Sequence, residues 1–502
     1  MIVAQELELK ECIGQGACGS VWKGLLRGTQ VAVKQLKTKY ENADQFKGEV
    51  AIMTQLRHPN VILFMGACVD PPYIVTEYLE GGDLQDCIKR HRQMVDKKET
   101  VPIKDMIQIS LDIAKGMAWL HQFKPKAIIH KDLKPTNIML DSNGRAKIID
   151  FGLSEVQKQR EMENRQFAGS ACWMSPEMLK GVPYTEKLDV FAYGIILWQI
   201  FTSSPEVYDV SEYKSTSSQA SFNLFIHDIV DNKKRPEIPS QLRISNEPIC
   251  ALIESSWNDD PEVRPSFTKI IDSLTPIFLN SVLKDTDAIQ MWKKYFPDKD
   301  SVPFDDLFDA IWETTHKREL DKALSKKCLE AALDIKNSPI SIDKFGLVLH
   351  WYGPLLPIGP TSPMLEKIQT LLRFPWFHPH LSGKEAEAIL SDGKSGEYLI
   401  RCSLYPTAPF TMSRIESRKN PTPCHHRITY NRTTHKYKMQ FQKKKNEAMD
   451  EIIGETLEEF VRNAEKALGL KKCVICKKYA HLFVSEEDTT DITSNYKVAS
   501  EK

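Results

Sequence analysis

A glycine-rich segment near the start of the chain contains the first residues whose spacing suits a chemical role. Gly14, Gly16 and Gly19 form the pattern G-x-G-x-x-G-x-V, which ends at Val21. Glycines let backbone N–H groups close over phosphate oxygens, because a Cβ at these positions would keep the amides away. Turns and strand-to-helix nucleotide folds share this pattern, so alone it is weak. Residues 21–33 have the pattern of two strands joined by a turn. This pattern favours a β-hairpin that covers the phosphates and disfavours a strand-to-helix phosphate turn.

A lysine and a glutamate further along could act on the same phosphates. Lys34 ends the second of these strands, and Glu49 lies in residues 45–56, whose apolar side chains have helical spacing. A lysine that bridges α- and β-phosphates must be oriented by a buried carboxylate, which Glu49 would supply. An isolated lysine at a strand end is otherwise usually a solvated charge.

The motifs that follow resemble those of the protein kinases. Residues 130–137 read HKDLKPTN, which matches the kinase catalytic loop H-R-D-x-x-x-x-N except for Lys131, and Asp150 opens a D-F-G motif. Glu177 stands where the family carries the last residue of A-P-E, and Arg264 resembles the usual partner of that glutamate. The resemblance implies a bilobal protein kinase fold.

The resemblance also implies a role for each residue of these motifs. Asp132 would accept the proton of the substrate hydroxyl, Lys134 would neutralise charge on the γ-phosphate, and Asn137 and Asp150 would hold Mg²⁺. An acidic and an amide oxygen suit this hard ion. Asp189 resembles the buried aspartate that anchors the backbone of the catalytic loop.

The adenine pocket is likewise assigned by resemblance. Thr76 would stand at its back, and the backbone from Glu77 to Leu79 would bond the adenine edge. The ring would lie between three apolar side chains, namely Val21, Ala32 and Met139.

Every group that phosphoryl transfer requires is present, so the resemblance implies an active enzyme that uses ATP and Mg²⁺. The alternative is a pseudokinase that serves as a phosphotyrosine-binding adaptor. Lys134 follows the serine/threonine signature, whereas residues such as Trp173 lean towards tyrosine kinases. This mixture resembles the tyrosine kinase-like group. We therefore expect transfer to protein Ser/Thr hydroxyls, with dual-specificity or tyrosine kinase activity as the alternative.

Lys131 makes regulation of the activity by activation-loop phosphorylation less certain. A lysine offers a phosphate only a point charge, whereas the guanidinium of an arginine bonds two phosphate oxygens at once. The candidate loop hydroxyls for such phosphorylation are Ser154, Ser170 and Ser175.

The carboxyl-terminal part resembles a Src-homology-2 (SH2) domain over about 100 residues. Residues 396–403 read GEYLIRCS after a helical pattern at 381–390. Arg401 ends an apolar strand, where an inward-pointing guanidinium would be costly unless it met an anion, and its fork suits a phosphate. The resemblance adds Ser403, His425 and Arg427 to a phosphotyrosine pocket. Many members carry an arginine early in the first helix where this chain has Gly383, and Arg427 is our candidate to supply that charge.

Between these modules the sequence predicts a helical linker. It contains two helix–loop–helix units that are loosely EF-hand-like. The loop around Asp298 lacks both the turn glycine and a bidentate glutamate, so we do not expect calcium binding.

We expect four parts in a multidomain α+β chain. They are a kinase domain (1–278), a helical, EF-hand-like linker (279–370), an SH2-type fold with a central antiparallel sheet flanked by two helices (371–470), and a polar tail (471–502). This order resembles the SH2-bearing, tyrosine kinase-like kinases of social amoebae, some of which are described as dual-specificity. The expected partners are protein substrates and tyrosine-phosphorylated proteins.

Composition agrees with these expectations. The chain has 502 residues, with 67 Lys and Arg against 67 Asp and Glu, so its formal net charge is 0. Zero net charge argues against a nucleic-acid partner. Residues 1–10 lack the features of a signal peptide or a myristoylation site, and we expect no transmembrane segment. The 11 scattered cysteines indicate reduced thiols. We therefore expect a cytoplasmic protein, recruited in some settings to membrane-associated phosphotyrosine proteins.

Overall fold

The computed structural model divides the chain into two compact units, Met1–Phe278 and Leu279–Lys502. The structure describes residues 2–16, 19–36, 50–51, 53–125, 127–150, 169–213, 218–297, 299–315, 320–335, 338–359, 361–405, 407–416, 423–431, 433–442 and 449–483.

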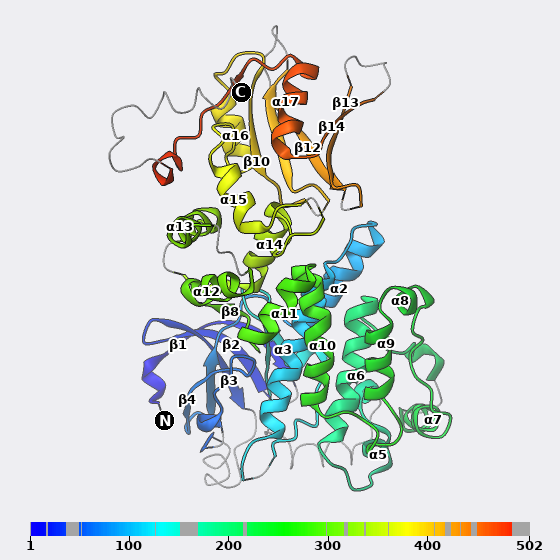
Figure 1. The fold of residues 1–502 in the computed structure, drawn as a ribbon. Helices are drawn as coiled ribbons and strands as arrows, with labels where there is room; N and C mark the ends of the chain where they lie inside the picture. Colours follow the sequence, from blue (N-terminus) through cyan, green and yellow to red (C-terminus); the bar gives the residue numbers. More distant parts are fainter. Residues whose placement is uncertain are drawn as a thin grey trace. The chain divides into compact units, whose positions relative to one another are not determined.

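A five-stranded antiparallel sheet opens the first unit (Figure 1). Its order is β1-β2-β3-β5-β4, and β2 and β3 form the hairpin predicted for residues 21–33. Strands β1 and β2 also pair, with Gly16 opposite Gly19. The inward-facing Val31, Val33 and Val75 are fully buried, as period-2 alternation requires. The strands are β1 (Leu7–Gly16), β2 (Gly19–Leu26), β3 (Thr29–Leu36), β4 (Phe64–Cys68) and β5 (Tyr73–Glu77).

Helices make up the rest of the first unit, together with a short hairpin of β6 (Ile138–Leu140) and β7 (Ala146–Ile148). Helix α6 (Lys187–Thr202) is buried from Leu188 to Phe201, which identifies it as the central helix of this part. The other helices are α2 (Leu84–Asp96), α3 (Ile103–His121), α5 (Pro176–Lys180), α7 (Ser218–Val230), α8 (Ser240–Ser245), α9 (Glu247–Ser256) and α10 (Phe267–Leu283).

The second unit begins with helices that form two helix–loop–helix pairs. Strand β8 (Ser301–Val302) pairs with β9 (Ile340–Ser341) and so joins the two loops. Trp292 stacks on Phe345 with ring centroids 5.8 Å apart, which ties the first pair to the second. The helices are α11 (Thr286–Tyr295), α12 (Phe304–Thr315), α13 (Lys322–Leu333), α14 (Ile342–Tyr352) and α15 (Met364–Leu372).

A six-stranded sheet with two helices completes the second unit. The order is β14-β13-β12-β11-β10-β15. Helix α16 (Gly383–Leu390) packs on β10 and β11, and α17 (Leu457–Leu468) packs on β13 and β14. The strands are β10 (Glu397–Cys402), β11 (Phe410–Ile415), β12 (Pro423–Asn431), β13 (Lys436–Phe441), β14 (Asp450–Gly454) and β15 (Lys472–Cys473).

The composition of residues 471–502 predicts a loose polar tail, but residues 471–483 are ordered against the sheet. Strand β15 pairs in parallel with β10, and the Val474 N–H donates to the Tyr398 carbonyl at 2.8 Å. Tyr479 and Ala480 are buried. This segment therefore belongs to the sheet, while residues 484–502 lie outside the described part of the chain.

The helices before the SH2-type sheet share its core, so they are more than the spacer that the sequence suggested. Lys367 of α15 is enclosed between the rings of Tyr430 and Tyr437, whose centroids lie 5.6 and 5.2 Å from its Nζ, and it donates a hydrogen bond to the Tyr437 hydroxyl. Burial lowers the pKa of Lys367 to about 8. Within the described residues, every helix is too short or too polar to span a bilayer.

Replacing Lys367 by methionine is expected to stabilise the second unit near neutral pH. The unfolded lysine keeps its proton to about pH 10.5, whereas the folded one releases it near 8, so burial of the ammonium penalises the folded state fully below pH 8. We expect Lys367→Met to raise the free energy of unfolding by on the order of 2 kcal/mol at pH 7. This gain should shrink as the pH rises from 8 to 10.

Urea unfolding of the full chain at several pH values measures the gain. Lys436→Met, at a half-exposed lysine of β13, is the control and should change little. A gain that does not depend on pH would show that Lys367 is not buried as an ammonium.

Candidate functional site

An ion pair joins the first sheet to the segment after β7. Lys34 Nζ lies 2.7 Å from Asp150 Oδ1, and the two side chains are 17% and 40% exposed. Asp150 has a φ of +59°, a left-handed conformation that Asp tolerates better than most residues. Glu49, the predicted partner of Lys34, lies outside the described residues, as do Phe151 and Gly152. The pairing with Asp150 was not predicted.

The predicted catalytic loop brings its polar side chains together. Lys134 Nζ lies 3.0 Å from Asp132 Oδ2, and Asn137 Nδ2 donates to the Asp132 carbonyl and to Oδ2 at 2.8 and 3.0 Å. Lys134 Nζ also donates to Ser170 Oγ at 2.7 Å. A carboxylate, an ammonium and an amide therefore share one site, beside a hydroxyl from a distant segment.

A buried carboxylate holds the backbone of this loop. Asp189, in the first turn of α6, has no exposed surface and accepts hydrogen bonds from the N–H groups of His130 and Lys131 at 2.8 and 2.9 Å. His121 Nε2 lies 2.9 Å from the same carboxylate. Burial acts to raise the pKa of Asp189, but the hydrogen bond and charge of His121 and the contacts with His130 outweigh it, so the pKa is lowered. Asp189 is therefore a charged anchor.

Lys131 occupies the one position that departs from the kinase motif. It has a φ of +66°, and its Nζ lies 5.5 Å from the ring centroid of Tyr184, which is exposed. Of the candidate loop hydroxyls, Ser170 contacts Lys134, whereas Ser175 is only 1% exposed. Ser175 as folded is therefore inaccessible to a modifying enzyme, and Ser154 lies outside the described residues.

A second buried ion pair fixes the Ser-Pro-Glu segment. Arg264 Nη1 and Nη2 bond the two oxygens of Glu177 at 2.6 and 2.9 Å, and the two residues are 1% and 8% exposed. Burial acts to raise the pKa of Glu177, but Arg264 outweighs it and the pKa is lowered. The bidentate geometry makes this a strong charge-assisted pair.

Three of the residues assigned to the adenine pocket, Val21, Ala32 and Thr76, lie on the neighbouring strands β2, β3 and β5, and Met139 lies on β6. Ala32 is opposite Thr76 in the β3–β5 register, and both are half-buried, as are Val21 and Met139. Partial exposure fits apolar side chains that line an open site better than it fits a closed core. Leu79 is buried at 8% exposure.

Glu77 is held by structural contacts of both its backbone and its side chain, and its N–H donates to the Leu63 carbonyl at 3.0 Å. Its carboxylate accepts from Lys147 Nζ at 2.7 Å and from the Leu63 N–H at 2.8 Å. Four residues further, the Gly81 N–H donates to the Leu140 carbonyl at 3.0 Å, which ties this connection to β6.

The glycine pattern lies at the tip of the β1–β2 hairpin. Gly14 is opposite Val21, and Gly19 has a φ of +153°, which L side chains rarely adopt. Residues 17 and 18 lie outside the described part of the chain.

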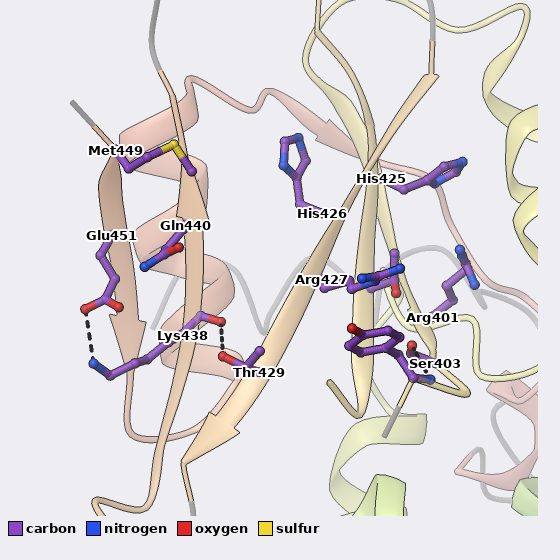
Figure 2. Close-up of a pocket in the computed structure, with 12 residues that line it drawn as sticks. Arg401, Ser403, His425, His426, Arg427, Thr429, Lys438, Gln440, Met449 and Glu451 are labelled. Carbon is purple, nitrogen blue, oxygen red and sulfur yellow. Dashed lines mark hydrogen bonds and ion pairs between the residues drawn. The ribbon is translucent and has the colours of Figure 1, made fainter. Parts of the chain in front are cut away.

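A pocket of about 840 Å³ opens on the second sheet (Figure 2). All four residues of the predicted phosphotyrosine site line it, carried by β10, the loop after it and β12. The lining residues are Arg401, Ser403, Tyr405, Thr411, His425, His426, Arg427, Thr429, Lys438, Gln440, Met449 and Glu451.

Hydrogen bonds orient the basic groups of this pocket. His425 bonds Ser413 Oγ through Nδ1 at 2.8 Å and Glu387 Oε1 through Nε2 at 3.0 Å. Arg401 Nε lies 3.4 Å from the same Ser413 Oγ, and partial burial lowers the pKa of Arg401 against the opposing charge of Glu387. A Cβ at Gly383 would lie 3.5 Å from Arg401 Nη2, so the missing arginine of this helix would have adjoined the guanidinium.

The contacts of Tyr405 and Glu387 in this region could not be predicted from the sequence. The Arg427 guanidinium lies 3.7 Å from the ring centroid of Tyr405, and Glu387 of α16 reaches His425. Both contacts join segments that are far apart in the chain, so no local pattern could have identified them.

Comparisons with known proteins agree with this geometry. Residues 7–274 match the protein tyrosine and serine/threonine kinase family, and residues 376–455 match the SH2 domain. The chain belongs to the SH2-containing protein kinases. The dual specificity protein kinase shkC of Dictyostelium discoideum is 32% identical to it over 435 residues, which cover 82% of each chain. The dual specificity protein kinase shkA of that organism is 29% identical over 511 residues, covering 95% of this kinase and 90% of the relative.

A relative from Arabidopsis thaliana, the serine/threonine-protein kinase CTR1, is 36% identical to this kinase over 284 residues. The match covers 55% of the kinase and 32% of that relative. The predictions of a protein kinase, of an SH2 domain and of their order along the chain are confirmed.

Removing the carboxylate of Glu177 is expected to destabilise the catalytic unit of this kinase. Glu177→Ala would leave the Arg264 guanidinium buried without its counter-charge, at a cost of about 3 kcal/mol or more. Urea unfolding of the full chain measures the loss. Glu206→Ala, at an exposed glutamate in the same unit, should stay within about 0.5 kcal/mol of the wild type. Equal unfolding free energies for the two variants would contradict the prediction.

Proposed function

We propose that this kinase transfers the γ-phosphate of ATP to serine and threonine hydroxyls of proteins and uses Mg²⁺ to do so. The observation that carries the proposal is the convergence of Lys134 and Asn137 on Asp132, each at 3.0 Å from its carboxylate, on a loop anchored by the buried Asp189. Phosphoryl transfer requires mainly positioning and charge neutralisation, which such a rigid polar site supplies.

The donor set suits the metal. Asp150 and Asn137 would hold Mg²⁺ through their oxygens, and the bound ion would neutralise the charge that develops on the phosphates. The Asp150 carboxylate has about four acceptor directions, so its contact with Lys34 leaves capacity for a metal.

The other side chains act directly on the substrates. Lys34, half-buried on β3, binds the α- and β-phosphates, and Gly14, Gly16 and Gly19 of β1 and β2 lie over them. Asp132 orients the acceptor hydroxyl and receives its proton. Lys134, 3.0 Å from that carboxylate, bonds the γ-phosphate as it moves to the acceptor.

The choice of Ser and Thr rests on Lys134 and on the residue it contacts. Ser170 Oγ accepts from Lys134 Nζ at 2.7 Å, which places a short side chain beside the base where an acceptor must enter. The relatives are named as dual specificity and serine/threonine kinases. Tyrosine phosphorylation as a second activity is the alternative that the dual specificity relatives favour.

Substitution of either catalytic carboxylate is expected to abolish transfer. Purified full-length kinase with radiolabelled ATP, Mg²⁺ and a generic protein substrate should incorporate label, and Asp150→Asn and Asp132→Asn should each lower the rate by about 100-fold or more. Asp96→Asn, at the exposed end of α2, is the control and should retain activity.

Hydrolysis of the labelled product then identifies the acceptor. Phosphoserine and phosphothreonine support the proposal, and added phosphotyrosine supports dual specificity. No incorporation by the wild type would leave a binding protein without catalysis.

We further propose that the SH2 domain binds phosphotyrosine at Arg401 and so recruits the kinase to tyrosine-phosphorylated proteins, including those at membranes. The guanidinium of Arg401 would bond two phosphate oxygens, with Ser403, His425 and Arg427 around them. The pocket of about 840 Å³ that these side chains line supports this assignment.

Arg401→Lys is expected to weaken binding of a phosphotyrosine peptide by about ten-fold or more, because an ammonium cannot replace the bidentate contact. Calorimetric titration of the full chain measures the affinity. Arg462→Lys, on the exposed side of α17, is the matched control and should bind like the wild type. Unchanged affinity in Arg401→Lys would refute the pocket assignment.

A further inference from the structure

The loop after Arg401 has a defined internal structure. The Ser403 N–H donates to the Pro409 carbonyl at 2.9 Å and closes the loop, and Ser403 Oγ accepts from the Tyr405 N–H at 3.1 Å. The Ala408 N–H donates to the Tyr405 carbonyl at 3.1 Å. This loop carries two residues of the pocket, Ser403 and Tyr405. Its conformation therefore decides where those side chains face a bound phosphate.

Trp351, which precedes the residues that match the SH2 domain, is hydrogen-bonded to this loop. Trp351, near the end of α14, donates its indole N–H to the Ser403 carbonyl at 2.7 Å. The next residue, Tyr352, is fully buried, and its hydroxyl lies 3.9 Å from Cys402 Sγ. Two successive residues of a helix thus contact the two residues that follow Arg401.

The same helical segment is also fixed to the far strands of the sheet. Lys367 is enclosed by Tyr430 and Tyr437, and Thr361 Oγ1 lies 3.2 Å from the Tyr430 hydroxyl and 3.1 Å from His435 Nδ1. Because α15 and the segment before it are anchored at β12 and β13, and α14 packs on α15, the Trp351 contact is made by a rigid support.

The contact at Ser403 reaches the basic groups of the pocket. Tyr405, whose N–H is bonded to Ser403, places its ring on the Arg427 guanidinium at 3.7 Å. A shift of the Ser403 carbonyl would therefore move the loop, the Tyr405 ring and the guanidinium beneath it.

We propose that Trp351 is a positioning residue for phosphotyrosine recognition and that α14 and α15, which precede the SH2 domain, form part of its binding unit. The inference rests on the proposed function of Arg401, since it concerns the loop beside that residue. The indole N–H fixes the Ser403 carbonyl, which orients the Ser403 hydroxyl and, through Tyr405, the Arg427 guanidinium. In this role Trp351 does not touch the ligand.

Trp351→Phe tests the proposal, because phenylalanine keeps an aromatic ring and removes the donor. In the full chain we expect the affinity for a phosphotyrosine peptide to fall about three- to ten-fold, the effect of one lost hydrogen bond. Amide hydrogen exchange in residues 402–410 of the unliganded protein should become faster.

Trp292→Phe is the matched control. Trp292 also donates its indole N–H to a backbone carbonyl, that of Lys299 at 3.0 Å, but in the loop after α11. This variant should bind the peptide like the wild type. A second variant, Tyr405→Ala at a 44% exposed side chain, should weaken binding, and its effect should not add to that of Trp351→Phe if both act through the same loop.

The outcomes separate the two hypotheses. If the wild type binds and Arg401→Lys weakens binding while Trp351→Phe does not, the positioning role is overturned and the proposed function stands. Equal losses in Trp351→Phe and Trp292→Phe would indicate general destabilisation and would also overturn it. If the wild type fails to bind the peptide, both hypotheses fall.

Discussion

The backbone N–H groups of His130 and Lys131 donate to the fully buried carboxylate of Asp189. The proposed active site of this kinase depends on that interaction. Removing Asp189 from water costs several kcal/mol, which only well-formed hydrogen bonds can offset. Here they come from the loop itself and from His121, so movement of the loop would remove the two backbone hydrogen bonds that this buried charge accepts. Asp132, next in the chain, takes its position from this constraint.

The grouping of the proposed catalytic residues could be predicted because it depends on side-chain type and spacing. Asp132, Lys134 and Asn137 lie within a few residues of one another, and the structure brings them together. The partner of Lys34 could not be predicted, because Asp150 lies 116 residues away and the pairing depends on how the sheet meets the segment after β7. Nor could the burial of Ser175 be predicted, since a serine before proline is usually solvated.

The second unit shows the same division. Its pocket residues Arg401, Ser403, His425 and Arg427 follow from motifs, and all of them line one cavity. The role of residues 471–483 does not, because β15 has two residues and a polar sequence, too short a stretch to show strand periodicity. Tertiary packing decides both this strand and the attachment of the preceding helices, and no local propensity reports it.

Because α14, α15 and β15 pack with the sheet, they determine the boundaries of the segment that can be transferred to another protein by gene rearrangement and still fold. A fusion that carried only residues 371–470 into another protein would expose Cys402 and Tyr437 to solvent, and would leave β10 an open edge strand able to pair with other chains. The portable module therefore begins near Leu279 and extends to about Phe483. Shuffling of SH2 domains from this lineage should preserve the helices with the sheet.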